Sequence, residues 1–277
     1  MVKRYNLGQK AIIAFVCVWS LFPIYWALNT SLMSNANAQS RPAQFFPFPV
    51  YLSNYKSLFS ASDLWPDFSR ALLNTVIECV AATVVTIIVA VLASYAFARL
   101  QFRFKSTIFY VVLATLSLPI YATLIPLYQI MNQFHLVNTY TGVVLVYTSG
   151  FLPLSMWIMY NYFLTIPREL EEAAFVDGAT PVAVLLRIMM PLALPGITSA
   201  AIITFLLAWA QFIFPLVLTS DNSTQPLTVF MTGLLGRHTV PFTLMNATGI
   251  LSIVVPAAIV ILLNRYIISG ILAGSIK

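Results

Sequence analysis

The densest group of ionisable side chains lies in one short segment of an otherwise apolar chain. Of the 22 charged residues (14 Lys and Arg plus 8 Asp and Glu), five fall within ten positions: Arg168, Glu169, Glu171, Glu172 and Asp177. Nowhere does the sequence show paired carboxylates, a histidine cluster or an activated serine or cysteine at catalytic spacing, and no metal-ligand spacing occurs. The segment therefore predicts docking to a partner rather than catalysis.

The pattern around these charges predicts two short helices joined by a turn. Pro167 suits the first position of a helix, and the acidic residues that follow favour the positive end of the helix dipole. Gly178 can adopt the left-handed conformation that ends a helix. Thr180 can cap a second helix that has Pro181 at its first position and ends at Pro191. We call this pair of helices, over residues 167–191, the elbow. A bent helix pair of this kind can dock into a partner protein; the alternative is a solvated amphipathic loop on a membrane surface.

The composition shows what must position this elbow. The chain has 277 residues, of which 60% are hydrophobic and 8% are charged, whereas soluble domains carry about 25% charged residues. Because these charged residues are too few for the surface of a water-soluble protein, we expect an all-α integral membrane protein. Cys17 and Cys79 lie in apolar runs and are interpreted as packing residues.

Uncharged stretches long enough to cross a bilayer, about 20 residues each, predict six transmembrane helices. The uncharged run 106–167 is too long for one helix and divides at the polar segment 132–139. We expect a single transmembrane domain over residues 1–277, with a cytoplasmic coupling loop at 164–195. The predicted spans are about 11–30, 72–98, 107–130, 141–163, 196–219 and 246–268.

The distribution of lysine and arginine predicts the orientation of the helices. One side of the membrane collects ten of these residues: Lys3, Arg4, Lys10, Arg99, Arg103, Lys105, Arg168, Arg187, Arg265 and Lys277. The other side collects four: Arg41, Lys56, Arg70 and Arg237. The side with ten should be the cytoplasm, which places both termini and the elbow there. A cleaved signal peptide ending near Ala36-Asn37-Ala38 is the alternative for the first span.

The elbow resembles the EAA motif of ABC importer permeases. Glu172-Ala173-Ala174 is followed after three residues by Gly178, after nine more by Ile188, and then by Pro191. The usual Leu-Pro ending of that motif reads Met190-Pro191 here. The spacing is maintained over 20 residues in the predicted cytoplasmic loop before the last two spans.

Other stretches resemble the carbohydrate-importer branch of binding-protein-dependent transport, and within it the MalG-like inner-membrane subunit. They are residues 52–55, 93–100 and the C-terminal tail 269–277. One departure is Ala208-Trp209-Ala210-Gln211-Phe212, where relatives often carry Asn and Glu after the Trp. Within this branch, permeases for glycerol phosphate-type compounds share the same pattern and provide the alternative substrate class.

The resemblance implies a type I ABC importer permease in the cytoplasmic membrane of a bacterium or archaeon. It would pair with a second, related permease, with two ATPase subunits at the EAA loop and with an extracytoplasmic solute-binding protein. The chain lacks a phosphate-binding Gly-x4-Gly-Lys-Ser/Thr loop, so we expect it to be no enzyme and to bind no cofactor, with ATP-Mg held by the partner subunits. The residues implied in ATPase coupling are Glu172, Ala173, Ala174, Asp177, Gly178, Ala179, Ile188 and Pro191.

A sugar pathway needs aromatic faces together with amides or hydroxyls. Trp157, Tyr160 and Asn161 are spaced to share one helix face, and Gln211 is a polar residue in the fifth predicted span. An aromatic belt at the membrane interface is the competing interpretation of the first three. A stand-alone secondary transporter would need mid-membrane carboxylates and an internal repeat; Glu78 is the one carboxylate in a span, and no repeat is evident.

Overall fold

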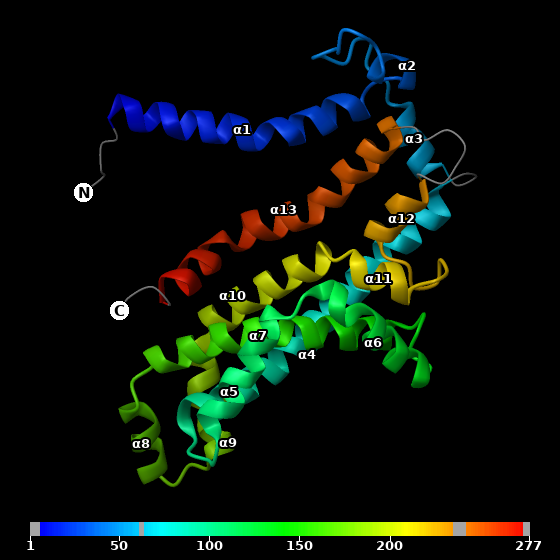
Figure 1. Cartoon of the computed structure of the whole chain (residues 1–277). Coiled ribbons are helices and arrows are strands. Elements are labelled where there is room, and N and C mark those ends of the chain that lie inside the picture. The colour runs from blue at the N-terminus through cyan, green and yellow to red at the C-terminus, as the bar shows by residue number, and fades with distance from the viewer. Residues whose placement is uncertain (1–5, 61–63, 235–241, 274–277) are drawn as a thin grey trace. The chain divides into compact units, whose positions relative to one another are not determined.

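A computed structural model describes residues 6–60, 64–234 and 242–273, and their side chains as far as residue 263. Within these ranges the chain is helical and contains no β-strand (Figure 1). Its elements are α1 (Leu7–Ser31), α2 (Asn35–Ala38), α3 (Ser53–Phe59), α4 (Trp65–Arg99), α5 (Lys105–Ala114), η1 (Thr115–Ser117), α6 (Ile120–Gln133), α7 (Tyr140–Thr165), α8 (Glu169–Val176), α9 (Pro181–Val184), η2 (Leu185–Met189), α10 (Met190–Trp209), α11 (Ile213–Leu218), α12 (Leu227–Gly233) and α13 (Phe242–Ala273).

Five described helices are long and apolar enough to cross a membrane. They are Leu7–Ser31, Trp65–Arg99, Tyr140–Thr165, Pro181–Trp209 and Phe242–Leu263. A sixth span results if the bent pair Lys105–Ser117 and Ile120–Gln133 counts as one. The all-helical, multi-span fold class predicted from composition is therefore confirmed.

The segment predicted as the third span is broken into two helices, whereas the uncharged run 107–130 predicted a single helix. Its two halves are bent by 105° at Leu118 and Pro119. Leu118 adopts an extended conformation with φ −72° and ψ 127°, because the ring of a following proline disfavours the α region. Hydropathy reports how favourably the side chains of a segment partition into lipid. It contains no information about the constraint that Pro119 places on the backbone of Leu118.

The helix that contains most of the fifth predicted span, 196–219, begins and ends earlier in the sequence, at Pro181 and Trp209. The expected helix end at Pro191 is wrong, because the helix of the elbow runs through this proline into the membrane. The π-helical turn η2 comes directly before it, and the N–H of Met190 donates to the carbonyl of Leu185 five residues back. The wider turn accommodates a residue that lacks an N–H and crowds the carbonyl four positions earlier.

The same span ends early because the chain breaks between Trp209 and Ile213. Phe212 has the non-helical angles φ −128° and ψ −46°. A straight continuation would bring the ring of Pro215 against the carbonyl of Gln211. The residues predicted as the end of the span instead form the separate short helix α11.

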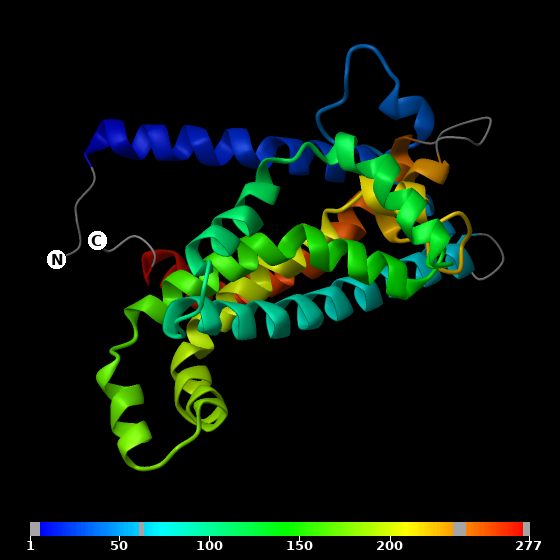
Figure 2. The same ribbon diagram turned by 60° about the horizontal axis from the view of Figure 1, so that its bottom comes forward.

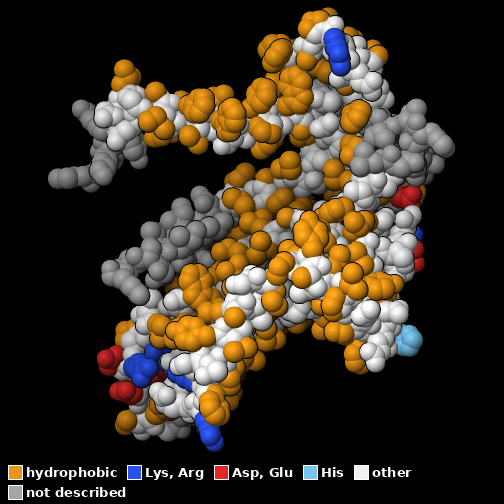
Figure 3. All heavy atoms as spheres, viewed as in Figure 1, with side chains coloured by type: hydrophobic (Ala, Val, Ile, Leu, Met, Phe, Trp, Pro, Cys, Tyr) orange, Lys and Arg blue, Asp and Glu red, His pale blue; other side chains and the backbone are white. Residues whose placement is uncertain are grey.

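The chain divides into two compact units, which are described separately. The first comprises residues 1–69 and 230–255. In it, Asn54 donates to the carbonyls of Ser31 (2.7 Å) and Met33 (3.0 Å). Thr243, near the start of α13, donates to the side chains of Asn35 (2.8 Å) and Asn54 (3.0 Å). These bonds fasten the end of α1 to α3 and α13, while apolar side chains cover the exposed length of α1 (Figure 3).

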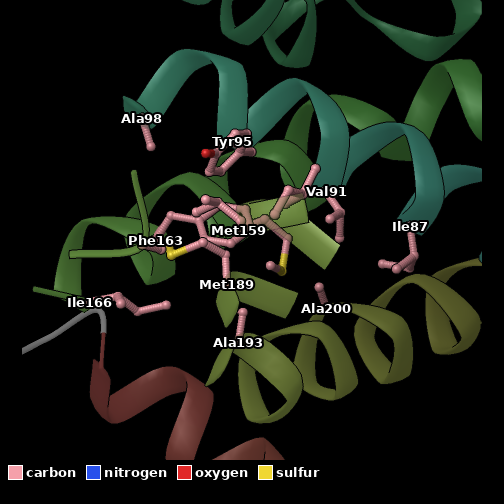
Figure 4. Packing of buried hydrophobic residues seen from close by; sticks show 13 residues of the cluster. Ile87, Val91, Tyr95, Ala98, Met159, Phe163, Ile166, Met189, Ala193 and Ala200 are labelled. Atoms are coloured by element: carbon pink, nitrogen blue, oxygen red, sulfur yellow. The ribbon is translucent and has the colours of Figure 1, made fainter. Parts of the chain in front are cut away.

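The second unit comprises residues 70–229 and 256–277 and contains the elbow. An apolar cluster joins α4, α7 and α10 to the elbow itself (Figure 4). Small residues such as Ala98, Ala193 and Ala200 are almost fully buried there, and small side chains let membrane helices approach closely. The buried members are Ile87, Val91, Tyr95, Ala98, Met159, Phe163, Ile166, Ala174, Val184, Leu185, Met189, Ala193 and Ala200.

At the other end of this unit, Asn138 fastens two loops together. Asn138 has φ 59°, its N–H donates to the carbonyl of Leu218 (2.7 Å), and its side-chain oxygen accepts from Ser220 and Thr224. Its side-chain amide donates to the carboxylate of Asp221. By the predicted orientation, this polar network lies on the extracytoplasmic side.

We expect this network to loosen in acid. Asp221 accepts hydrogen bonds from the hydroxyl and the N–H of Ser223 and from Asn138, and these bonds lower the pKa of its carboxyl below the ordinary value of 3.8. A lowered pKa means that the stabilisation is complete above the ordinary value and is lost as the pH falls through the lowered one. Hydrogen exchange of residues 218–226, corrected for intrinsic rates, should therefore accelerate in strong acid. Asp221→Asn should abolish this pH dependence; an unchanged dependence in that variant would assign it to another group.

Candidate functional site

The elbow projects from the second unit beyond the ends of α7 and α10. Figures 1 and 2 show α8 and α9 as a bent pair at this end. Charged side chains gather here, next to helices whose visible surface is largely hydrophobic (Figure 3). The two short helices predicted from the charge pattern are present as α8 and α9.

Helix α8 ends in the conformation that the glycine predicted. Gly178 has φ +84°, its N–H donates to the carbonyl of Phe175 (3.0 Å), and the N–H of Ala179 donates to that of Ala174 (2.9 Å). This pair of bonds is the Schellman motif, in which the residue after the C-cap is left-handed. The reversal of the chain between α8 and α9 thus depends on the backbone of Gly178.

The start of α9 also follows the prediction. The hydroxyl of Thr180 accepts from the N–H of Ala183 (3.3 Å), and Pro181 is the first helical residue. The start of α8 differs, because α8 begins at Glu169 with Arg168 as its N-cap. Pro167 therefore precedes the cap instead of opening the helix.

The residues of the motif divide between two faces of α8. Glu172, Ala173, Asp177 and Gly178 are exposed, whereas Ala174 is 8% exposed and belongs to the apolar cluster of the second unit. Only the first alanine of the pair is therefore available to a partner. Further along, Ala179 and Ile188 are half-buried against the same cluster, and Pro191 is exposed.

An ion pair at the base of α8 was not anticipated from the sequence. Glu171 is buried, and its Oε1 lies 2.5 Å from Nε of Arg99, the last residue of α4. The hydroxyl of Tyr95 donates to Oε2 of the same carboxylate (3.3 Å). The residue implied in ATPase coupling is its neighbour Glu172, which is exposed. The sequence shows an arginine at the end of an apolar span and a glutamate in the first turn of a helix, but neither local pattern states that the two meet.

Residues 84–273 match the family described as the inner membrane component of binding-protein-dependent transport systems. The chain belongs to this family. The permease is thus a multi-pass protein of the cytoplasmic membrane, in agreement with the prediction from its spans.

Characterised relatives match this permease over nearly its whole length. The sulfoquinovosyl glycerol transport system permease protein SmoH of Agrobacterium fabrum is 32% identical over 264 residues, which are 95% of this chain and 91% of SmoH. The trehalose/maltose transport system permease protein MalG of Thermococcus litoralis is 30% identical over 279 aligned positions, covering 100% of this chain and 98% of MalG. The resemblance to carbohydrate importer permeases inferred from the motifs is confirmed.

A solved structure has the same fold. It belongs to a bacterial ABC transporter involved in the import of the acidic polysaccharide alginate, with a TM-score of 0.79 and 21% identity. The match covers 95% of this permease and 99% of that chain. The predicted fold class, an all-helical ABC importer permease, is thereby confirmed.

The residues proposed for the substrate pathway of the permease do not form one cluster. On α7, Trp157 is exposed, whereas the ring of Tyr160 packs on Phe109 of α5 with centroids 4.4 Å apart. The amide of Asn161 donates to the carbonyl of Trp157 in its own helix (2.7 Å). Gln211 lies in the break after α10, where its side chain accepts from the N–H of Phe212 (3.2 Å).

Within this unit Glu78 is buried in α4, and neither of its carboxyl oxygens has a hydrogen-bond partner among the described residues.

Proposed function

We propose that this permease forms half of the membrane pathway of an ATP-driven importer and receives movement from an ATPase subunit at its elbow. The observation that carries the proposal is the exposed face of α8. Glu172 and Ala173 point outward from a helix whose opposite face is buried in the apolar cluster. A helix seated in this way can be pushed by a partner without being detached.

The chemistry of the face suits a cleft with basic groups. Glu172 and Asp177 contribute negative charge, while Ala173 permits close approach because its side chain is short. We infer that Glu172 pairs with a basic group on the ATPase. The permease has no phosphate-binding loop of its own, so the energy comes from ATP-Mg bound by two separate ATPase subunits. A second, related permease and a solute-binding protein complete the proposed assembly.

For the substrate we propose a sugar or a related polyol. Relatives covering most of the chain are named for trehalose and maltose, for sulfoquinovosyl glycerol and for alpha-glucosides. On this chain Trp157, Tyr160, Asn161 and Gln211 remain the proposed pathway residues. A glycerol phosphate-type compound is the alternative. Uptake of trehalose or maltose by vesicles containing the complete importer, competed by unlabelled glycerol 3-phosphate, would separate the two classes.

Cross-linking tests the docking surface. In a background with Cys17 and Cys79 replaced, Ala173→Cys should cross-link efficiently to the ATPase subunit of the membrane complex. Ala174→Cys is the matched control and should react poorly, because residue 174 faces the apolar cluster. The products are resolved by electrophoresis after treatment with a short reagent that reacts with a thiol at one end and an amine at the other, so that the introduced thiol is linked to a lysine of the ATPase subunit. Absence of a cross-link from position 173 in an active complex would refute the proposed docking face.

A further inference from the structure

The side chain of Arg99 connects the ends of three helices. Its Nη2 donates to the carbonyls of Phe163 (2.8 Å) and Ile166 (2.6 Å), which lie in the last turn and at the C-cap of α7. Its Nε lies 2.5 Å from the carboxylate of Glu171, in the first turn of α8. Arg99 itself ends α4. One guanidinium therefore holds together the cytoplasmic ends of α4 and α7 and the start of the elbow.

These contacts are shielded from water. The side chains of Arg99 and Glu171 are 6% and 7% exposed. The buried residues Tyr95, Phe163 and Ile166 surround them, and the ring of Tyr95 packs edge-on against Phe163 (Figure 4). Separating α4 from α8 would leave each charge of the ion pair without its partner in a site of low polarity. The free-energy cost of such an uncompensated charge strongly opposes the separation. The positive charge of Arg99 at the last carbonyls of α7 also interacts favourably with the negative end of the dipole of that helix.

The covalent connection between α7 and α8 is poorly suited to transmit force. Ile166 is extended, with φ −82° and ψ 126°, and helical structure resumes only at Glu169. At the other end of the elbow, by contrast, α9, η2 and α10 form continuous helix into the fifth span. Without the ion pair, movement of α8 would reach the fifth span but be absorbed in the connector before α7.

We propose that Arg99 and Glu171 are positioning residues that make α8 move as one body with the cytoplasmic ends of α4 and α7. This Arg99–Glu171 clamp passes displacement of the elbow to the second and fourth spans, while the continuous helix passes it to the fifth. The inference rests on the proposed function, because it assumes that the ATPase moves the elbow. Beyond the proposed function, the clamp determines which spans receive the movement of the elbow.

A distance measurement tests the clamp directly. Spin labels at Phe175 on α8 and Leu92 on α4, both partly exposed, are introduced into the complete transporter after replacement of Cys17 and Cys79. Phe175 lies beside the docking face rather than within it. The distance distribution, measured by pulsed electron paramagnetic resonance, should be the same without nucleotide and with ATP bound. A distance between the two labels that changes on ATP binding, in a complex that still transports, would overturn the proposal. It would do so regardless of how substitutions of Arg99 or Glu171 behave.

Glu171→Gln supplies the functional test. It retains the shape of the side chain but removes the charge, so substrate imported per ATP hydrolysed should fall about tenfold, and the distance distribution should broaden. Glu169→Gln is the matched control, since it removes the same charge from the same turn of α8 at an exposed position and should change neither quantity. Unchanged coupling in Glu171→Gln would overturn the clamp.

The two proposals fail in distinguishable ways. If the docking proposal holds, the ATPase subunits should still copurify with Glu171→Gln and cross-link from Ala173→Cys, because the exposed face of α8 that carries Glu172 and residue 173 is retained. Loss of coupling with docking retained supports the clamp. Loss of copurification together with coupling would instead show that Glu171 serves docking, which contradicts the clamp. Absence of the cross-link from Ala173→Cys in a permease that retains Glu171 would refute the proposed function itself.

Discussion

Gly178→Val should abolish transport while leaving the permease in the membrane at its normal level. The backbone of Gly178 has φ +84°, a conformation in which a β-branched residue is a genuine outlier. The resulting strain is of the order of 1–3 kcal/mol. The spans do not depend on this residue for their insertion, so the strain should be relieved by a changed angle between α8 and α9. Uptake by vesicles and immunoblotting of the membranes measure the two expectations.

The surroundings of Gly178 permit a sharper version of this experiment. A Cβ added there would meet nothing within 4 Å, so an effect cannot come from a clash within the permease itself. Gly178→Asn should therefore retain most of the transport, because asparagine tolerates the left-handed region, and Gly178→Ala should be intermediate. If Asn and Val were equally inactive, the explanation by backbone conformation would be wrong. Full transport by the Val variant would remove the elbow from the mechanism.

The parts of the elbow that were predictable are those determined by local chemistry. Gly178 ends α8, and Thr180 and Pro181 start α9, because each acts within one turn of its own position. Five of the six predicted spans followed from hydropathy for a similar reason, since burial in lipid is a property of each segment alone. Span boundaries were less accurate wherever proline acted, as at Leu118–Pro119 and around Pro191.

Contacts between distant segments could not be derived in this way. Arg99 and Glu171 lie in different predicted spans or loops, and nothing in either local pattern states that they meet. The opposite exposure of Ala173 and Ala174 is a similar case, because it depends on which face of α8 packs on α4 and α7. The same limit applies to the pathway residues: helical spacing put Trp157 and Tyr160 on one face, but the position of Phe109 decides what Tyr160 contacts.

The second large effect is expected at Gly142, in the first turn of α7. A Cβ at this position would lie 2.1 Å from the carbonyl oxygen of Leu136. The obstacle is backbone, so no change of side-chain rotamer can remove it. Gly142→Ala should therefore destabilise the permease by about 3 kcal/mol, the upper part of the usual range for overpacking. The thermal unfolding midpoint of the purified protein in detergent, with the yield of monodisperse protein, measures this loss.

Gly150 provides the matched control, since it lies in the same helix and a Cβ there would meet nothing within 4 Å. Gly150→Ala should not destabilise the permease, because replacing glycine by alanine in the middle of a helix contributes about 0.5–1 kcal/mol of stability. An equal loss in both variants would mean that α7 resists any added side chain, and the close approach of Leu136 would not be the cause.

The damage from Gly142→Ala should also spread in a predictable direction. Relief of the clash requires the segment before α7 to move, and that segment includes Thr139, whose hydroxyl accepts from the N–H of Gly142 (3.0 Å). It also includes Asn138, which holds the loop around Asp221. Hydrogen exchange at residues 218–226 should therefore accelerate at neutral pH in Gly142→Ala but not in Gly150→Ala. The elbow is at the opposite end of α7, so cross-linking from Ala173 should persist in whatever fraction of the variant remains folded.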